Sequence, residues 1–216
     1  MKLGQGLAPL NESRWVVLDV ETSGLDVRRD RLLAVAAIGI EVDWVGKRLS
    51  IVPGDSFEVV LRQEVRSSRD NILLHGIGTQ RQREGLDPAS ALEAFARFAG
   101  ESPLLAFHSA FDQAMIKRHM LMPDVRARLP QPMANPWLDI EHLCAVTHEH
   151  VAARSLDDWM AHFGITCANR HEAVSDTFAE CEVLLRIWPR VAAQCACWRD
   201  VQKLAAQLHW VARALK

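Results

Sequence analysis

The 216 residues carry 27 acidic and 25 basic side chains, and this length predicts one domain with an appendage rather than two full domains. Hydrophobic residues make up 49% of the chain and charged residues 24%, near the averages of globular proteins, which argues against disorder and against a fibrous repeat. The formal charge of -2 excludes a global basic field, so any nucleic-acid binding must be local or metal-assisted.

No apolar run reaches the roughly 18 residues of a membrane helix, so no membrane association is expected. The stretch from Met1 to Arg14 contains one Lys and no long apolar core, which is unlike an export signal. The five cysteines are an odd number and form no CxxC pair, which indicates a reducing compartment. We therefore expect a soluble protein of the cytoplasm.

The first half of the chain predicts three strands after an irregular lead over residues 1–14. Short apolar runs rich in β-branched residues lie at residues 15–18, 32–40 and 57–61. Gly-containing turns at residues 45–47 and 53–55 separate the second run from the third. Together these features predict a three-stranded meander.

The second half alternates between predicted helices and short strands. Asp87 and Pro88 are typical of a helix cap and first turn, and Gly100 of its end. A strand over residues 104–107, a helix over 111–122 stopped by Pro123, and an extended segment over 137–139 follow. Further helices are predicted from Ser155 to Gly164, and over residues 173–188. This order predicts an α/β fold with a mixed central sheet flanked by helices, in which two β/α units follow the meander.

Apolar residues recur every three or four positions toward the end of the chain, which predicts an amphipathic helical tail bent at Pro189. They are Leu184, Trp188, Val191, Cys195, Trp198, Val201, Ala205, Leu208, Ala212 and Leu215. Packing of this stripe on the parent domain is the leading interpretation, and a surface for a partner or for self-association is the alternative. The predicted divisions are a lead (1–14), a main domain (15–188) and a helical extension (189–216).

Asp19 and Glu21 end the first predicted strand. Side chains two apart in a strand point to the same face, so the two carboxylates would converge. Acidic pairs at this spacing also arise by chance. Their position is the stronger signal, because acids rarely end a buried strand without a ligand or partner that offsets desolvation.

Acidic residues recur in three segments, each at a predicted strand end or helix start. The segments are VLDVETSGL at residues 17–25, LLAFHSAFD at residues 104–112 and HEAVSD at residues 171–176. In this order they resemble the three motifs of the DEDDh (DnaQ-like) 3'-5' exonuclease superfamily. LHGI at residues 74–77 is similar to the element before that superfamily's middle helix. The form DVETSG is most similar to the proofreading epsilon group of bacterial DNA polymerase.

This resemblance implies a ribonuclease H-like exonuclease domain that hydrolyses phosphodiester bonds with two divalent cations. Asp19, Glu21, Asp112 and Asp176 would bind the cations, with Asp19 bridging both. Oxygen ligands favour hard cations, so Mg²⁺ or Mn²⁺ is expected. His171 would act as general base, so activity should fall in acid. Taken singly, Asp112 and Asp176 are also typical of helix starts, where the helix dipole favours a carboxylate.

The resemblance further implies that Thr22 and Leu25 grip the terminal nucleotide, with His75 close to it. His108 would be either structural or close to the scissile phosphate. The second motif departs from the frequent family form HNAxFD, because HSAFD is one residue shorter and lacks the Asn. Positioning near the nucleotide is therefore expected to differ.

The predicted function is a metal-dependent 3'-5' exonuclease acting on the 3' end of single-stranded nucleic acid, with DNA favoured over RNA. One alternative is a 3'-5' exoribonuclease of the same family. Another is a catalytically silent module on the same fold that binds nucleic acid or protein. A polymerase or other protein, or a second copy bound through the C-terminal stripe, is the expected kind of protein partner.

Overall fold

Apolar and β-branched residues form a five-stranded sheet in the computed structural model, which describes residues 9–129 and 133–208. The strands are β1 (Arg14–Thr22), β2 (Leu32–Asp43), β3 (Arg48–Val60), β4 (Leu104–Ala106) and β5 (Trp137–Asp139). They lie in the order β3-β2-β1-β4-β5. β2 is antiparallel to β1 and β3, whereas β4 is parallel to β1 and to β5. The predicted mixed sheet, a meander followed by two β/α units, is confirmed.

The turn predicted at residues 53–55 is wrong, because β3 continues through it as a bulge. Ser56 pairs with Ile38 and Val52 pairs with Gly39, which leaves the residues between them without partners in the ladder. The bulge places the Asp55 carboxylate 2.6 Å from Nε of Arg14 in β1. A Cβ at Gly39 would lie 1.9 Å from an Asp55 oxygen, so this glycine makes room for the ion pair.

Nine helices occur within the described residues. They are α1 (Arg69–His75), α2 (Thr79–Glu84), α3 (Pro88–Ala99), α4 (Ser109–Met120), α5 (Pro123–Arg128), α6 (Ile140–Thr147), α7 (Leu156–Phe163), α8 (Ala173–Ala192) and α9 (Trp198–Ala206). The predictions of α3, α4, α7 and α8 are confirmed. The sequence analysis missed α1, α2, α5 and α6, which have six to eight residues each and are too short for a readable hydrophobic period. Pro123 follows the end of α4, as predicted, but it also begins α5.

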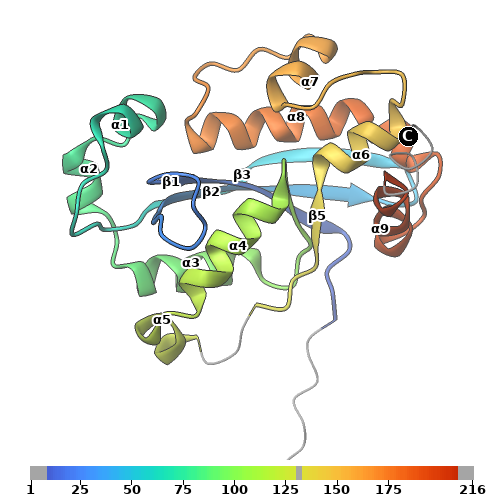
Figure 1. Ribbon diagram of the computed structural model, residues 1–216. Coiled ribbons are helices and arrows are strands. Elements are labelled where there is room, and N and C mark those ends of the chain that lie inside the picture. The colour runs from blue at the N-terminus through green and yellow to red at the C-terminus, as the bar shows by residue number, and fades with distance from the viewer. Residues whose placement is uncertain (1–8, 130–132, 209–216) are drawn as a thin grey trace, which may run out of the picture.

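Helices cover both faces of the sheet (Figure 1). α3, α4 and α5 lie on one face, and α6, α7 and α8 lie on the other. Successive residues of β1 point to opposite faces, so Val16 belongs to the core under α3 and α4, and Val17 to the core under α8. By the same alternation, Asp19 and Glu21 lie on the face of Val17, which α8 covers.

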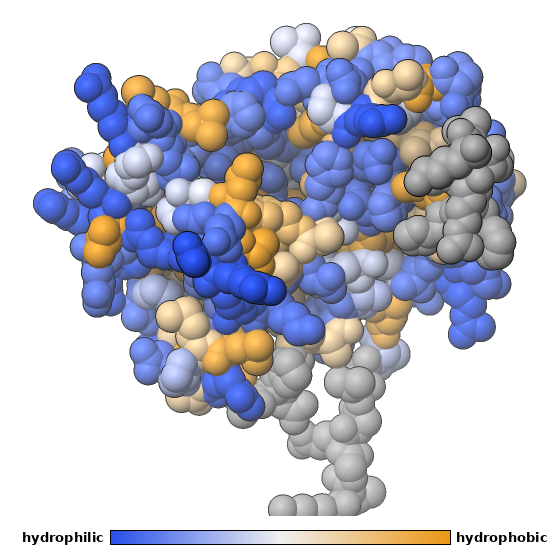
Figure 2. All heavy atoms as spheres, in the orientation of Figure 1, coloured by the Kyte–Doolittle hydropathy of each residue, from blue (hydrophilic) through white to orange (hydrophobic). Residues whose placement is uncertain are grey.

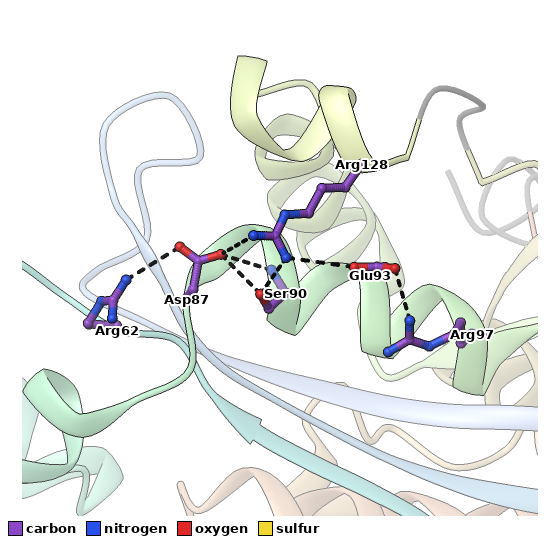
Figure 3. A network of polar contacts seen from close by, with 6 residues as sticks. All are labelled: Arg62, Asp87, Ser90, Glu93, Arg97 and Arg128. Carbon is purple, nitrogen blue, oxygen red and sulfur yellow. Dashed lines mark hydrogen bonds and ion pairs between the residues drawn. The ribbon is translucent and has the colours of Figure 1, made fainter.

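A polar network fastens the predicted start of α3 (Figure 3). Oδ2 of Asp87 accepts a hydrogen bond from the Ser90 backbone N–H at 3.1 Å. Arg62, just beyond β3, and Arg128, the last residue of α5, both pair with Asp87. Arg128 also pairs with Glu93 of α3. Each exposed pair contributes little free energy alone, but together they connect β3, α3 and α5.

An aromatic cluster joins the two ends of the described chain. Trp15 of β1 lies against Trp44, Trp188 and Trp198, with ring centroids 5.8, 5.6 and 5.1 Å away. The backbone carbonyl of Glu12 accepts hydrogen bonds at 3.1 Å from the indoles of Trp15 and Trp44. The Glu12 carboxylate accepts another from the Trp198 backbone N–H at 3.0 Å. The start of α9 is therefore tied to the lead that precedes β1.

The C-terminal stripe packs on this same core, as predicted. All its positions from Leu184 to Ala205 are buried, and Leu208 packs partly against them. α8 runs through Pro189, so the bend expected there lies instead at residues 193–197, before α9. Ala212 and Leu215 lie outside the described residues. An independent role for segment 189–216 stays a prediction.

Within the described part of the chain, no helix combines the length and apolar character needed to span a bilayer. The face seen in Figure 2 is mainly hydrophilic, with apolar residues in small groups between polar ones. This face therefore offers polar surface with local apolar contacts rather than one broad apolar interface.

Candidate active site

The first pair of acidic residues lies at the end of the central strand. Asp19 and Glu21 occupy the last four residues of β1, which β2 and β4 flank. Both side chains are partly buried. The N-terminal half of α8 and the helices α1 and α2 lie near this end of the sheet (Figure 1). The two acidic side chains at the end of β1 therefore lie near residues from distant parts of the sequence.

Asp112 joins this pair from the first turn of α4, and only 4% of its surface is exposed. The backbone N–H of Val20 lies near the carboxylates of both Asp19 and Asp112 and lowers the pKa of each. Both carboxylates therefore lie close to the same backbone group. The shortened second motif thus brings Asp112 to Asp19.

Asp176 joins from the first turn of α8 and is also buried. Its Oδ2 accepts a hydrogen bond from the His171 backbone N–H at 3.0 Å. His171 has a φ of 64°, in the left-handed region that His tolerates better than most residues, and its side chain is exposed. The third motif therefore holds its own loop in shape and presents the imidazole to solvent at the edge of the cluster.

The clustered carboxylates raise the pKa values of one another. Burial and repulsion from Asp176 raise the pKa of Asp19 to about 8. Burial and the charges of Asp19 and Asp176 raise the pKa of Glu21 to about 9. Burial, with the Asp19 charge second, raises the pKa of Asp112 well above its usual value. Carboxyl groups crowded in this way are typical of a functional site.

Arg170 is a basic residue of the cluster that the sequence analysis missed. Its Nε donates to Asp157 of α7 at 2.6 Å, and its guanidinium also contacts Asp176. Its positive charge lowers the pKa values of Asp19 and Glu21, against the larger opposite effect of burial. The signal in the sequence is its place directly before His171, but a loop Arg is usually solvated.

The donors of this cluster suit hard divalent cations, because all are carboxylate oxygens. A further carboxylate oxygen, Oε2 of Glu180, is buried without a hydrogen-bond partner. Within residues 9–129 and 133–208, no three His, Cys, Asp or Glu side chains already close around one point as a metal ion requires. Arg170 holds the Asp176 carboxylate, so this side chain would have to leave the guanidinium to bind a cation.

We expect the free energy of unfolding in EDTA to fall between pH 7 and 9. The raised pKa values of Asp19 and Glu21 mean that the native state holds protons which the unfolded chain has lost, so stability decreases as pH rises toward 8 and 9. One pH unit within this window costs up to about 1.4 kcal/mol per group, or about 3–6 °C in Tm for a protein of this size. Thermal unfolding at several pH values measures this slope.

Mg²⁺ should reverse this loss, since it favours the ionised carboxylates, and its stabilising effect should be larger at pH 9 than at pH 7. The buried cysteines also lose protons on unfolding in alkali, so Asp19→Asn is the control and should show a smaller slope in EDTA. A Tm in EDTA that stays constant over this range would contradict the interpretation.

The loop after β1 holds two of the predicted substrate residues. The Thr22 hydroxyl donates to the Gly24 carbonyl at 2.7 Å, which closes a tight turn. Asp30 accepts hydrogen bonds from the Ser23 hydroxyl and the Asp26 backbone N–H. Leu25 projects from this turn with 86% of its surface exposed. An apolar side chain so exposed next to the carboxylates is available to a ligand.

His75, the third predicted substrate residue, is only 2% exposed and contacts other residues through both ring nitrogens. Nδ1 accepts from the Ile77 backbone N–H at 2.9 Å, so Nε2 carries the proton and donates to Asn71 Oδ1 at 2.9 Å. The Asn71 amide in turn donates to the Thr22 carbonyl at 2.9 Å. His75 thus positions the loop after β1 through Asn71, which the sequence analysis did not identify.

His108, the fourth, is exposed at the N-cap of α4 with a φ of 59°. The carboxylate of Asp139, at the end of β5, accepts from the backbone N–H groups of His108 and Ser109 at 3.0 and 2.9 Å. Asp139 therefore fixes the turn that leads to Asp112. Asp139, like Asp19, is an acidic residue at the end of an apolar strand. This signal could have identified Asp139 from the sequence.

Comparison with protein families and curated sequences places this geometry in context. Residues 16–184 match the model of the RNase_T exonuclease family. The Rhodobacter capsulatus DNA polymerase III subunit epsilon-like protein is 29% identical over 189 residues, which are 86% of this chain and 25% of that protein. The PolC-type DNA polymerase III of Clostridium perfringens is 28% identical over 174 residues, 80% of this chain and 11% of that protein. The chain spans a quarter or less of these relatives.

Solved structures of exonuclease I share the fold. One superposes with a TM-score of 0.65 at 16% identity, over 85% of this chain and 44% of exonuclease I. E. coli exonuclease I in complex with a dT13 oligonucleotide also superposes with a TM-score of 0.65 at 16% identity, over 83% of this chain and 42% of the exonuclease I chain. Together with the family match, this likeness confirms the ribonuclease H-like α/β fold.

Proposed function

The chain belongs to the RNase_T exonuclease family, and we propose that it is a metal-dependent 3'-5' exonuclease that removes nucleotides from the 3' end of single-stranded DNA. The observation that carries this proposal is the meeting of four carboxylates at the end of β1. Asp19, Glu21, Asp112 and Asp176 come from three separate segments of sequence, and the charges of Asp19 and Asp176 raise the pKa values of neighbouring carboxyl groups in this set.

These four carboxylates would hold the divalent cations that the family generally uses. When bound, two such cations would neutralise charge on the attacking and leaving oxygens of the phosphodiester. Asp19 interacts with all three other groups, because its charge raises the pKa values of Glu21 and Asp112 and the charge of Asp176 raises its own pKa. It is therefore the residue we propose to contact both cations.

His171 would take the proton of the attacking water. Its backbone is anchored to Asp176, and its imidazole is exposed beside the cluster, where it can turn toward a substrate phosphate. A neutral imidazole is the usual protein base near pH 7. A substrate phosphate that replaces the Asp176 contact of Arg170 would also place a guanidinium on the developing negative charge.

Single-stranded DNA suits the surface around the carboxylates. Large apolar side chains are exposed on two segments that meet at the end of β1: Leu25 on the loop after β1, and Leu73 and Leu74 on α1, whose Asn71 binds the Thr22 carbonyl. Unpaired bases offer flat apolar faces that pack on such side chains. DNA is favoured over RNA because the similar sequences are DNA polymerase III proteins and one exonuclease I structure holds dT13.

The test is digestion of 5'-labelled single-stranded DNA and RNA of the same sequence with Mg²⁺, Mn²⁺ or EDTA. A ladder shortening from the 3' end of DNA, absent in EDTA and blocked by a 3'-phosphorothioate linkage, is the expected result. A ladder on RNA alone would favour the exoribonuclease. Binding of either strand without cleavage in Mg²⁺ or Mn²⁺ would favour the catalytically silent module.

A polymerase or other protein partner stays a prediction, supported by the names of the similar sequences. Dimerisation through the C-terminal stripe is also untested, although the stripe positions up to residue 205 are buried within this chain. Sedimentation at high protein concentration would detect a dimer.

A further inference from the structure

Glu180 reaches the carboxylate cluster from within the core. It lies on α8 four residues after Asp176, so both side chains occupy the same side of the helix. Thr177, between them, lies with its hydroxyl 3.5 Å from the Ala36 carbonyl, which places this side of α8 against β2. The Phe107 backbone, just after β4, lies near the Glu180 carboxylate and lowers its pKa. The side chain thus extends toward the end of β1, which carries Asp19, and toward the first turn of α4, which carries Asp112.

The Glu180 side chain is buried but incompletely satisfied. Only 1% of the residue is exposed, and Oε2 has no hydrogen-bond partner. A buried carboxylate oxygen without a partner costs free energy, so such groups normally indicate an ion, a proton or a ligand. A packing role alone would be met better by an apolar side chain of similar volume.

The charged neighbours of Glu180 are other carboxylates. Burial, followed by the charges of Asp19 and Asp112, raises its pKa well above the usual value. The negative potential at Glu180 therefore comes from the residues proposed to bind the cations. A divalent cation near Asp19 and Asp112 would offset both the burial and the repulsion.

We propose that Glu180 is a fifth carboxylate of the metal centre, whose free Oε2 binds the cation held between Asp19 and Asp112. This inference rests on the proposed function.

The experiment is a calorimetric titration of the purified full chain with Mn²⁺, which measures the affinity of wild type, Glu180→Gln and Glu182→Gln for the metal. Gln keeps the shape of Glu and removes its charge. Glu182 is the matched control, because it lies two residues on along the same helix, points away from Glu180 and is partly exposed. Glu180→Gln should weaken Mn²⁺ binding about 10–100-fold, as loss of a metal-centre partner does, while Glu182→Gln binds like wild type.

Thermal unfolding in EDTA separates a metal role from a structural one. At pH 8 the Glu180→Gln variant should melt at or above the wild-type temperature, since a buried charge next to other carboxylates has been removed. Glu180→Asp keeps the carboxylate but shortens the side chain by one methylene, so this variant should also bind Mn²⁺ more weakly than wild type. It replaces Glu180→Gln in the titration if the Gln variant fails to fold.

Three outcomes would overturn parts of this scheme in distinguishable ways. Wild-type protein that cleaves DNA, with a Glu180→Gln variant that binds Mn²⁺ within twofold of it, would refute the role of Glu180 alone. A variant that loses stability equally with and without Mn²⁺, at unchanged affinity, would make Glu180 a structural residue. Wild-type protein that neither binds Mn²⁺ nor cleaves DNA would refute the proposed function together with this inference.

Discussion

Replacing Asp19 by Asn should lower kcat/KM by more than about 10³-fold without unfolding the protein. Divalent cations contribute several kcal/mol of transition-state stabilisation in such reactions, and each 1.36 kcal/mol is a factor of ten in rate. Asp19 interacts with Glu21, Asp112 and Asp176, so its loss would disturb the ligands of both proposed cations. Initial rates on single-stranded DNA over a range of Mg²⁺ concentrations measure the effect.

The same variant should be at least as stable as wild type in EDTA at pH 8. Asn has the shape of Asp but no charge, and the removed charge repels Asp176 and Glu21. Glu41→Gln is the control, since Glu41 is an exposed acid on the neighbouring strand β2 and its replacement should leave the rate unchanged. Turnover by Asp19→Asn within tenfold of wild type would contradict the assignment of this residue.

Replacing His171 by Asn should lower kcat about 10²–10⁴-fold, the usual contribution of a general base. Asn is chosen because it tolerates the left-handed backbone at this position, so the backbone N–H should still hold Asp176. Mn²⁺ affinity measured by calorimetry should therefore stay close to that of wild type.

His150→Ala is the control for this experiment, because His150 is an exposed histidine on the loop after α6. Its replacement should leave kcat unchanged. If His171→Asn keeps full activity, another group takes the proton of the attacking water.

Much of the fold could be predicted because its signals are local. The apolar run before Asp19 predicts a buried strand, and Asp87-Pro88 predicts the start of α3, since both depend on residues next to one another in sequence. The third strand was predicted less well. Its bulge depends on Arg14, which is 41 residues from Asp55 and cannot be paired with it by inspection of the sequence.

The residues that surround the candidate site were harder to identify than the motif acids. Asp139 and Asn71 hold backbone groups of other segments, and each is an ordinary polar residue in its own local sequence. His75 was expected to contact substrate, but its two hydrogen bonds are visible only once α1 has formed. A sequence pattern predicts which helix or strand a residue belongs to, but not which distant residue it will contact in the folded protein.

The amino-acid sequence by itself determined the order of the strands' apolar runs, the positions of the four motif carboxylates and the family resemblance, because these depend on composition and spacing along the chain. Only the tertiary structure decided that Arg170 contacts the acidic cluster, that Asp139 shapes the second motif and that Glu180 is buried without a partner beside it. The physical reason is that charge interaction and burial depend on distance in space, and folding brings α8, α4 and β1 together from positions more than about 50 residues apart.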